Sequence, residues 1–109
     1  MIQNYIEFNL NQGEPEFGDY VICKERYSGS DTNFKELLHF IETNVGKILF
    51  LSYDEIDYYV AYDNTPEYIH NYFKSQNSTR RMERKEILYF SKNKEELEKV
   101  LKMIKYKLK

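Results

Sequence analysis

The sequence predicts an α+β protein in which a mainly antiparallel sheet of about five strands packs in two layers with two main helices. Three observations lead to this prediction. Short stretches alternate between apolar and polar residues, two longer stretches carry apolar residues at helical spacing, and no repeat or linker divides the chain. The expected order is β-β-α-β-β-(short α)-β-α. At 109 residues, the chain from 1 to 109 is expected to form a single domain.

The first two strands are predicted before the first helix. Ile2–Leu10 alternates in the manner of a half-buried strand, and residues 11–19 contain the glycines and the proline of a loop. Tyr20–Tyr27 is the second predicted strand. It contains Cys23, the single cysteine, which excludes a disulfide within the chain and is expected to be a buried, inert thiol.

The two main helices are predicted from their apolar stripes. The first is expected to begin near Asn33, which forms a possible capping box with Glu36, and to end at Gly46 in a left-handed C-cap. Asn93 is expected to cap the second. The stripes are Phe34, Leu37, Leu38, Ile41 and Val45 in the first helix and Leu97, Val100, Leu101, Ile104 and Leu108 in the second.

Between these helices, Lys47–Asp63 is typical of a β-hairpin. If Asp54 and Glu55 form a two-residue turn, the facing pairs are Tyr53 with Ile56, Leu51 with Tyr58 and Leu49 with Val60. The members of these pairs would share one face, which would be the core face. The other face would carry Ile48, Phe50, Ser52, Asp57, Tyr59 and Ala61.

The chain after the hairpin is expected to form one short helix, one strand and the last helix. Thr65 is a good N-cap for a helix over Pro66–Lys74, whose apolar side would be Tyr68, Ile69, Tyr72 and Phe73. Residues 75–85 are polar and then basic, which predicts a loop. Glu86–Phe90 is the last predicted strand.

Charge is unevenly distributed although the net charge is only −2. Residues 1–70 hold 13 acidic and 4 basic side chains, and residues 71–109 hold 5 acidic and 12 basic ones. The chain as a whole therefore has no strong preference for a polyanion, and nucleic acid is not the expected partner. Because no secretory signal or membrane-spanning stretch is present, we expect a cytoplasmic protein.

The sequence contains no motif that predicts catalysis. It has no glycine-rich phosphate loop and no serine elbow, and neither His39 nor His70 stands at metal-ligand spacing. Asp54, Glu55 and Asp57 could form a carboxylate site, but three acids on a hairpin turn are more often a solvated tip. We therefore expect a protein that is not an enzyme, with no cofactor and no metal.

Two surfaces are candidates for binding. The first is acidic and rich in tyrosine, a combination that suits a basic protein partner. Its residues are Asp54, Glu55, Asp57, Tyr59, Asp63 and Glu67. The second is the basic run of Arg80, Arg81, Arg84 and Lys85, which could hold phosphates. Either set could instead be a core edge or a solvated face.

The residues from Asp54 to Tyr72 are rich in acidic and aromatic side chains, and the chain is small, cysteine-poor and has the composition of an A/T-rich gene. In these features it resembles a known type of protein. This type is the immunity proteins of bacterial polymorphic-toxin and contact-dependent inhibition systems. The resemblance implies a non-enzymatic inhibitor that binds a cognate toxin, often a basic nuclease. The alternatives are a phage or plasmid anti-defence protein that mimics nucleic acid, and a small nucleic-acid-binding regulator that uses the basic C-terminal part.

Self-association is the last expectation. If both helices cover the same side of the hairpin, Ile48, Phe50 and Tyr59 on the other face need a cover of their own. A second protomer would bury this apolar area, and two-fold dimers are the commonest oligomers. The sequence therefore favours a homodimer slightly over a monomer.

Overall fold

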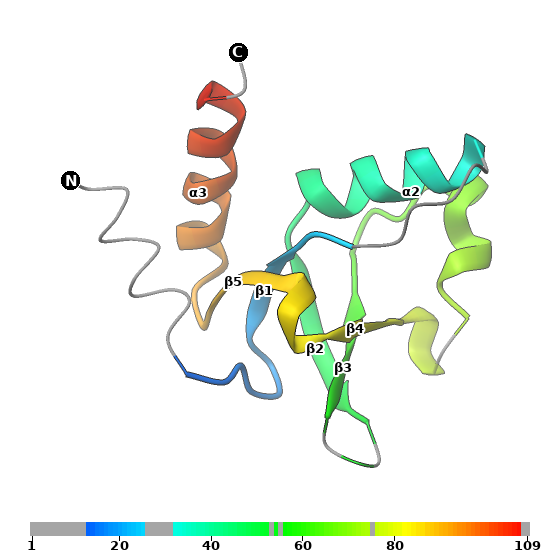
Figure 1. Cartoon of the computed structure of the whole chain (residues 1–109), viewed down its shortest axis with the longest axis horizontal. Helices are drawn as coiled ribbons and strands as arrows, with labels where there is room; N and C mark the ends of the chain where they lie inside the picture. Colours follow the sequence, from blue (N-terminus) through cyan, green and yellow to red (C-terminus); the bar gives the residue numbers. More distant parts are fainter. Residues whose placement is uncertain (1–12, 26–31, 53, 55, 75, 108–109) are drawn as a thin grey trace.

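In the computed structural model, five antiparallel strands form one sheet in the order β4-β3-β2-β1-β5 (Figure 1). The structure describes residues 13–25, 32–52, 54, 56–74 and 76–107. The strands are β1 (Tyr20–Cys23), β2 (Gly46–Leu51), β3 (Asp57–Ala61), β4 (Arg80–Glu83) and β5 (Ile87–Ser91). The helices are α2 (Thr32–Thr43) and α3 (Lys94–Lys107), and three 3₁₀ turns are η1 (Glu67–Tyr72), η2 (Gln76–Ser78) and η3 (Arg84–Glu86).

The predicted class is confirmed: one antiparallel sheet of five strands packs with two main helices. The predicted strand over Ile2–Leu10 lies outside the described residues. β4 was not predicted, because its residues read as a basic loop. Of its two inward side chains only Met82 is apolar, and the other, Arg80, is charged. No helix in the described part of the chain combines the length and hydrophobicity that crossing a membrane requires.

The sheet is strongly curled. In a flat sheet of this order the edge strands β4 and β5 would lie about 19 Å apart, since neighbouring strands are about 4.8 Å apart. They are nevertheless joined by η3 alone, whose three residues advance only about 6 Å. The concave face therefore encloses the main core, to which all five strands contribute buried side chains. These include Val21, Ile48, Val60, Met82 and Ile87.

The two helices contact opposite faces of β1. Phe34, Leu37 and Ile41 of α2 pack into the main core with Val21 and Cys23. By contrast, α3 forms a separate cluster that contains Leu97, Val100 and Ile22. Because neighbouring residues of a strand point to opposite faces, Ile22 faces α3 and its neighbours face α2. The described stripe residues inside each helix pack as predicted, but the two stripes do not point to one core. Val45, predicted for the first stripe, lies beyond α2 and packs against the α3 cluster, and Leu108 lies outside the described residues.

The predicted hairpin exists with a shifted register. Leu51 pairs with Tyr58 as expected, but Val60 pairs with Ile48, because an irregularity interrupts β2 between Ile48 and Phe50. Consequently Ile48 is fully buried in the main core and Leu49 is not part of it. This corrects the predicted core face, and it removes Ile48 from the face expected to bind a second protomer.

Two predicted helix caps and the predicted apolar side of the short helix have different outcomes. Asn93 caps α3 as predicted, since its Oδ1 accepts the N–H of Glu95 at 2.9 Å. The predicted cap of the short helix is wrong, because Thr65 Oγ1 donates to Tyr62 O and the 3₁₀ turn η1 begins without a side-chain cap. Ile69 and Phe73 are buried as expected, whereas Tyr68 is 58% exposed.

The sequence predicted that Gly46 caps the first helix, and this prediction is wrong. Gly46 is instead the first residue of β2. A Cβ at this position would lie 2.5 Å from Val60 Cγ1 and 2.9 Å from the ring of Tyr62. The missing side chain lets the Tyr62 ring cross β2 into the core, where it packs edge-on against Phe40 and Phe73. Glycine is therefore needed here for close approach.

Gly46→Ala should destabilise the protein by about 1–3 kcal/mol, because the new methyl group overpacks a filled core. The free energy of unfolding in urea measures this loss. Lys47→Ala is the control, since Lys47 is the exposed neighbour on the same strand. If Gly46→Ala were as stable as the control variant, the close approach of Tyr62 would not constrain this position.

Candidate partner-binding site

The connection between β2 and β3 is longer than the predicted two-residue turn. β2 ends at Leu51 and β3 begins at Asp57, so five residues form the loop. Buried Ser52 closes it, because its N–H donates to Asp57 O at 2.8 Å and its Oγ accepts the N–H of Asp57 at 3.0 Å. Tyr53 and Glu55, both named in the sequence prediction, lie outside the described residues.

Asp54 organises the tip of this loop. One of its carboxylate oxygens accepts hydrogen bonds from the Ser52 hydroxyl and from the N–H of Ile56, the latter at 3.2 Å. The Ser52 bond, followed by the Ile56 bond, holds the pKa of Asp54 below its ordinary value. The carboxylate is therefore charged at neutral pH and serves as a structural acceptor within the loop.

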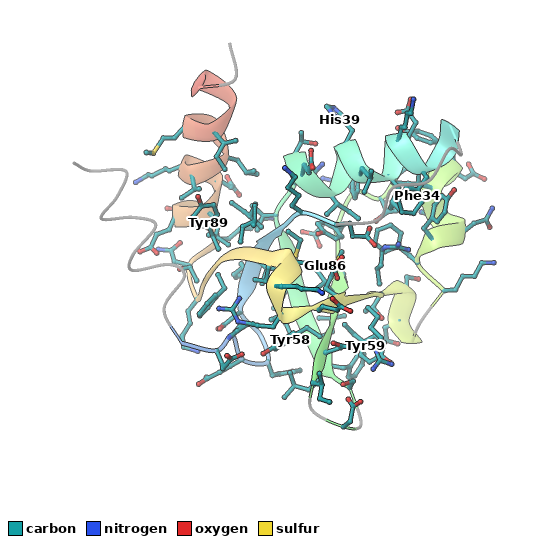
Figure 2. All side chains as sticks on the ribbon, in the orientation of Figure 1. Phe34, His39, Tyr58, Tyr59, Glu86 and Tyr89 are labelled. Carbon is teal, nitrogen blue, oxygen red and sulfur yellow. The ribbon has the colours of Figure 1, made fainter. Side chains whose placement is uncertain are left out.

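Arg81 of β4 gathers the charged and aromatic residues beside the loop. Its Nε donates to Asp57 Oδ2 at 2.7 Å, and its Nη2 lies 3.8 Å from Asp54 Oδ2. The guanidinium also stacks over the Tyr59 ring, 5.9 Å from the centroid. Tyr58 and Tyr59 point to opposite sides of β3, Tyr58 into the core and Tyr59 away from it (Figure 2).

Apolar side chains remain exposed at the same end of the hairpin. Ile56 is 65% exposed and Leu51 is 43% exposed. Ile56 borders an open hollow of about 600 Å³, whose other lining residues are Asp57, Glu83, Arg84, Lys85, Ile87 and Leu88. We call Leu51, Asp54, Ile56, Asp57, Tyr59 and Arg81 the hairpin end. It combines exposed aliphatic groups, an aromatic ring and a rim of both charge signs.

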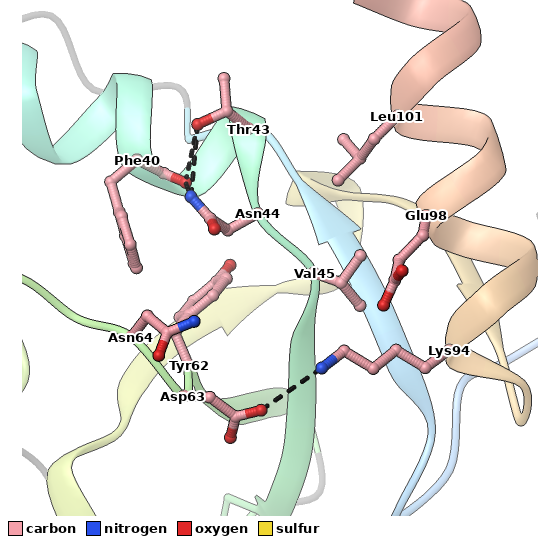
Figure 3. A pocket seen from close by; sticks show the side chains of 10 residues that line it. All are labelled: Phe40, Thr43, Asn44, Val45, Tyr62, Asp63, Asn64, Lys94, Glu98 and Leu101. Carbon is pink, nitrogen blue, oxygen red and sulfur yellow. Dashed lines mark hydrogen bonds and ion pairs between the residues drawn. The ribbon is translucent and has the colours of Figure 1, made fainter.

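Asp63 and Glu67 do not belong to the hairpin end. They follow the other end of β3, and six extended residues from Asp57 to Asp63 span up to about 20 Å. Asp63 is exposed and pairs with Lys94 of α3 at 3.4 Å beside a small hollow of about 250 Å³ between α2 and α3 (Figure 3). Glu67 is exposed in the first turn of η1. The predicted acidic surface is therefore divided between two places.

Part of the uneven charge of the sequence is paired within the molecule. Basic residues of the C-terminal part form ion pairs with acidic residues of the first 63. These pairs are Arg80–Glu25, Arg81–Asp57, Arg84–Glu14, Lys92–Asp19 and Lys94–Asp63. The sequence alone could not show this pairing, because it depends on which strands are neighbours. Arg81 was absent from the predicted acidic site for the same reason.

The remaining titratable candidates lie apart from the hairpin end. Burial raises the pKa of Cys23 to about 12, so the thiol stays protonated at neutral pH. His39 points from α2 away from the sheet (Figure 2), and the His70 ring is hydrogen-bonded to Thr65 O at 2.9 Å. Within the described ranges, no group of three or more His, Cys, Asp or Glu side chains is placed to hold a metal ion.

Ser52→Ala should raise the pKa of Asp54 toward its ordinary value, because the largest interaction that lowers it is removed. A carboxyl group whose pKa is lowered in the folded state stabilises that state at pH values above its unfolded-state pKa. This stabilisation is lost as the pH falls through the lowered, folded-state pKa. The free energy of unfolding of the variant should therefore decrease less on acidification than that of the wild type. NMR titration of the Asp54 carboxyl carbon measures the shift, with Ser91→Ala as control. An unchanged titration curve would show that Ser52 does not hold the loop acid.

Comparison of the chain with protein-family models, with curated proteins and with solved structures finds no match.

Proposed function

We propose that this protein is a non-enzymatic inhibitor that binds and neutralises a cognate bacterial toxin through the hairpin end. The observation that carries the proposal is the exposure of Ile56 and Leu51 at the end of the hairpin that also carries the stacked pair Tyr59–Arg81. Interface hot spots are enriched in tyrosine and arginine, and they usually lie within a rim of polar groups. The hairpin end has this composition.

Two features support a protein partner over a small ligand. The hollow that Ile56 lines is wide open and not an enclosed cavity, and Ile56 itself is 65% exposed. Small-molecule sites are concave and bury most of their ligand. A protein surface can cover Ile56 and Leu51 together without entering the fold.

A basic toxin, such as a nuclease, fits the carboxylates that stay exposed here. The side chains of Asp54 and Glu83 are 50% and 54% exposed. Because Arg81 offsets Asp57, we expect apolar contact to contribute more to affinity than long-range attraction does. The choice of a toxin rests on the resemblance to immunity proteins carried by the residues from Asp54 to Tyr72.

The nucleic-acid alternative has less support. It needs free cations in the basic run, yet Arg80, Arg81 and Arg84 each contact carboxylates of the same chain.

An anti-defence protein would use the same kind of surface as a toxin inhibitor. The two are distinguished by their genes, since a toxin gene should lie directly upstream in one case and a phage early region should surround the gene in the other.

The test uses the polypeptide encoded directly upstream as the candidate toxin. The wild-type chain should bind it and restore growth to cells that express it. Ile56→Asp and Asp54→Lys should each weaken binding by about 30-fold, the loss typical of a hot-spot residue. Calorimetry measures affinity, and growth measures neutralisation.

Glu42→Lys on α2 is the matched control, because it makes the same charge change at an exposed position outside the hairpin end. Binding that is lost with Glu42→Lys but kept with the two hairpin variants would move the contact surface to α2. A wild-type chain that neither binds the upstream polypeptide nor restores growth would contradict the proposed function itself.

A further inference from the structure

β4 lies at one edge of the sheet, and on its outer side the described residues place no further strand. Among the described elements, β3 is the one that packs extensively against it. The N–H of Glu83 donates to Glu86 Oε1 at 2.8 Å and not to β3. Because backbone groups alternate in direction along an antiparallel strand, the polar groups of Arg81 face the same outer side. This edge can therefore accept a further strand.

The side chains of β4 also alternate. Met82 pairs with Tyr58 and is fully buried on the core face, while Arg81 and Glu83 pair with Tyr59 and Asp57 on the opposite face. About half of each charged side chain is exposed. The outer face of this edge thus presents a cation and an anion two residues apart.

A second copy of the chain complements this pattern. In an antiparallel pair, directly opposed residues lie on the same face of the sheet. Pairing through a two-fold axis at Met82 therefore sets Arg81 of one copy opposite Glu83 of the other, and the symmetry repeats the pair. The same register aligns the Arg81 N–H with the Glu83 C=O of the other copy. An edge with charges of one sign would instead repel itself.

An open hollow lies beside each end of β4. Next to Arg81 lies an open hollow of about 400 Å³ lined by Asn71, Tyr72, Lys74, Arg80 and Arg81. Next to Glu83 lies the larger hollow that contains Asp57 and Ile56. A two-fold axis at Met82 brings the basic hollow of one copy toward the hollow of the other, whose lining holds both acidic and basic side chains.

We propose that the chain forms a symmetric homodimer by antiparallel pairing of its β4 edges, with Arg81 of each copy opposite Glu83 of the other. The sheets of the two copies then join into one. The two hairpin tips extend beyond opposite ends of the β4 pair, so each copy keeps a tip for a partner. This dimer replaces the one expected from the Ile48, Phe50 and Tyr59 face, in which Ile48 is buried.

The test measures the mass of the purified full chain by light scattering over a range of micromolar concentrations. The wild-type chain should approach twice 13.3 kDa as concentration rises. Arg81→Glu and Glu83→Arg each place like charges opposite one another and should raise the dimer dissociation constant at least about tenfold. Glu42→Arg on α2 is the matched control and should leave the dimer unchanged.

A mixture of the two variants decides whether the register is correct. Each variant repels itself, but the Arg81→Glu chain presents two anions to the two cations of the Glu83→Arg chain. The mixture should therefore restore the dimer mass, which requires that both variants are folded. A wild-type mass that stays at the monomer value, or variants that dimerise as the wild type does, would overturn the proposal. So would a mixture of folded variants that remains monomeric. None of these results depends on the toxin.

Discussion

The ion pair between Arg80 and Glu25 joins more parts of this fold than any other polar contact described here. Arg80 Nε donates to Glu25 Oε2 at 2.8 Å, Nη2 meets the other carboxylate oxygen, and Nη1 donates to Tyr72 O at 3.0 Å. The guanidinium lies 5.8 Å from the ring centroids of both Phe34 and Tyr72. One side chain therefore links the segment after β1, the start of α2, the end of η1 and β4.

The energetic role of this pair follows from its burial. The Glu25 side chain is 7% exposed and that of Arg80 is 19% exposed, so both charges lose most of their hydration on folding. Two-point pairing, the Tyr72 carbonyl and two aromatic faces compensate for this loss. Buried ion pairs often add little net stability compared with apolar groups, but they strongly disfavour any arrangement that separates them. Arg80 thus fixes where β4 lies, and β4 in turn positions Arg81 beside the hairpin.

The distance in sequence between interacting residues explains which features could be predicted. Most of the stripe residues of α2 and α3, the Asn93 cap and the pairing of Leu51 with Tyr58 depend on residues close together in sequence, so local patterns sufficed for them. β4 was missed because its inward Arg80 is neutralised by Glu25, 55 residues away. Gly46 was assigned to a helix end because its contact, the ring of Tyr62, comes from the residue that follows β3, 16 positions along the chain. Local patterns carry no information about such distant partners.

The candidate site was predicted in part for the same reason. Asp54, Asp57 and Tyr59 are neighbours in sequence and remain neighbours in the structure, whereas Asp63 and Glu67 follow the far end of β3. The arginine that offsets the first group comes from β4 and could not be assigned to it in advance. An acidic surface in the sequence thus becomes a mixed one in the fold, with apolar Ile56 and Leu51 exposed at the same end of the hairpin.

Arg81 belongs to both proposed surfaces, and its chemistry allows both. A guanidinium carries five N–H donors in a planar fork. Nε is committed to Asp57 at 2.7 Å, while Nη2 lies 3.8 Å from Asp54, too far for a hydrogen bond. Donors therefore remain for the Glu83 carboxylate of a second copy while Asp57 and the Tyr59 ring keep the side chain in place. Because a carboxylate accepts several hydrogen bonds, Glu83 can pair across the edge and still contact Lys85 at 3.2 Å. Dimerisation through β4 would then leave the hairpin end in the arrangement that we propose a partner recognises.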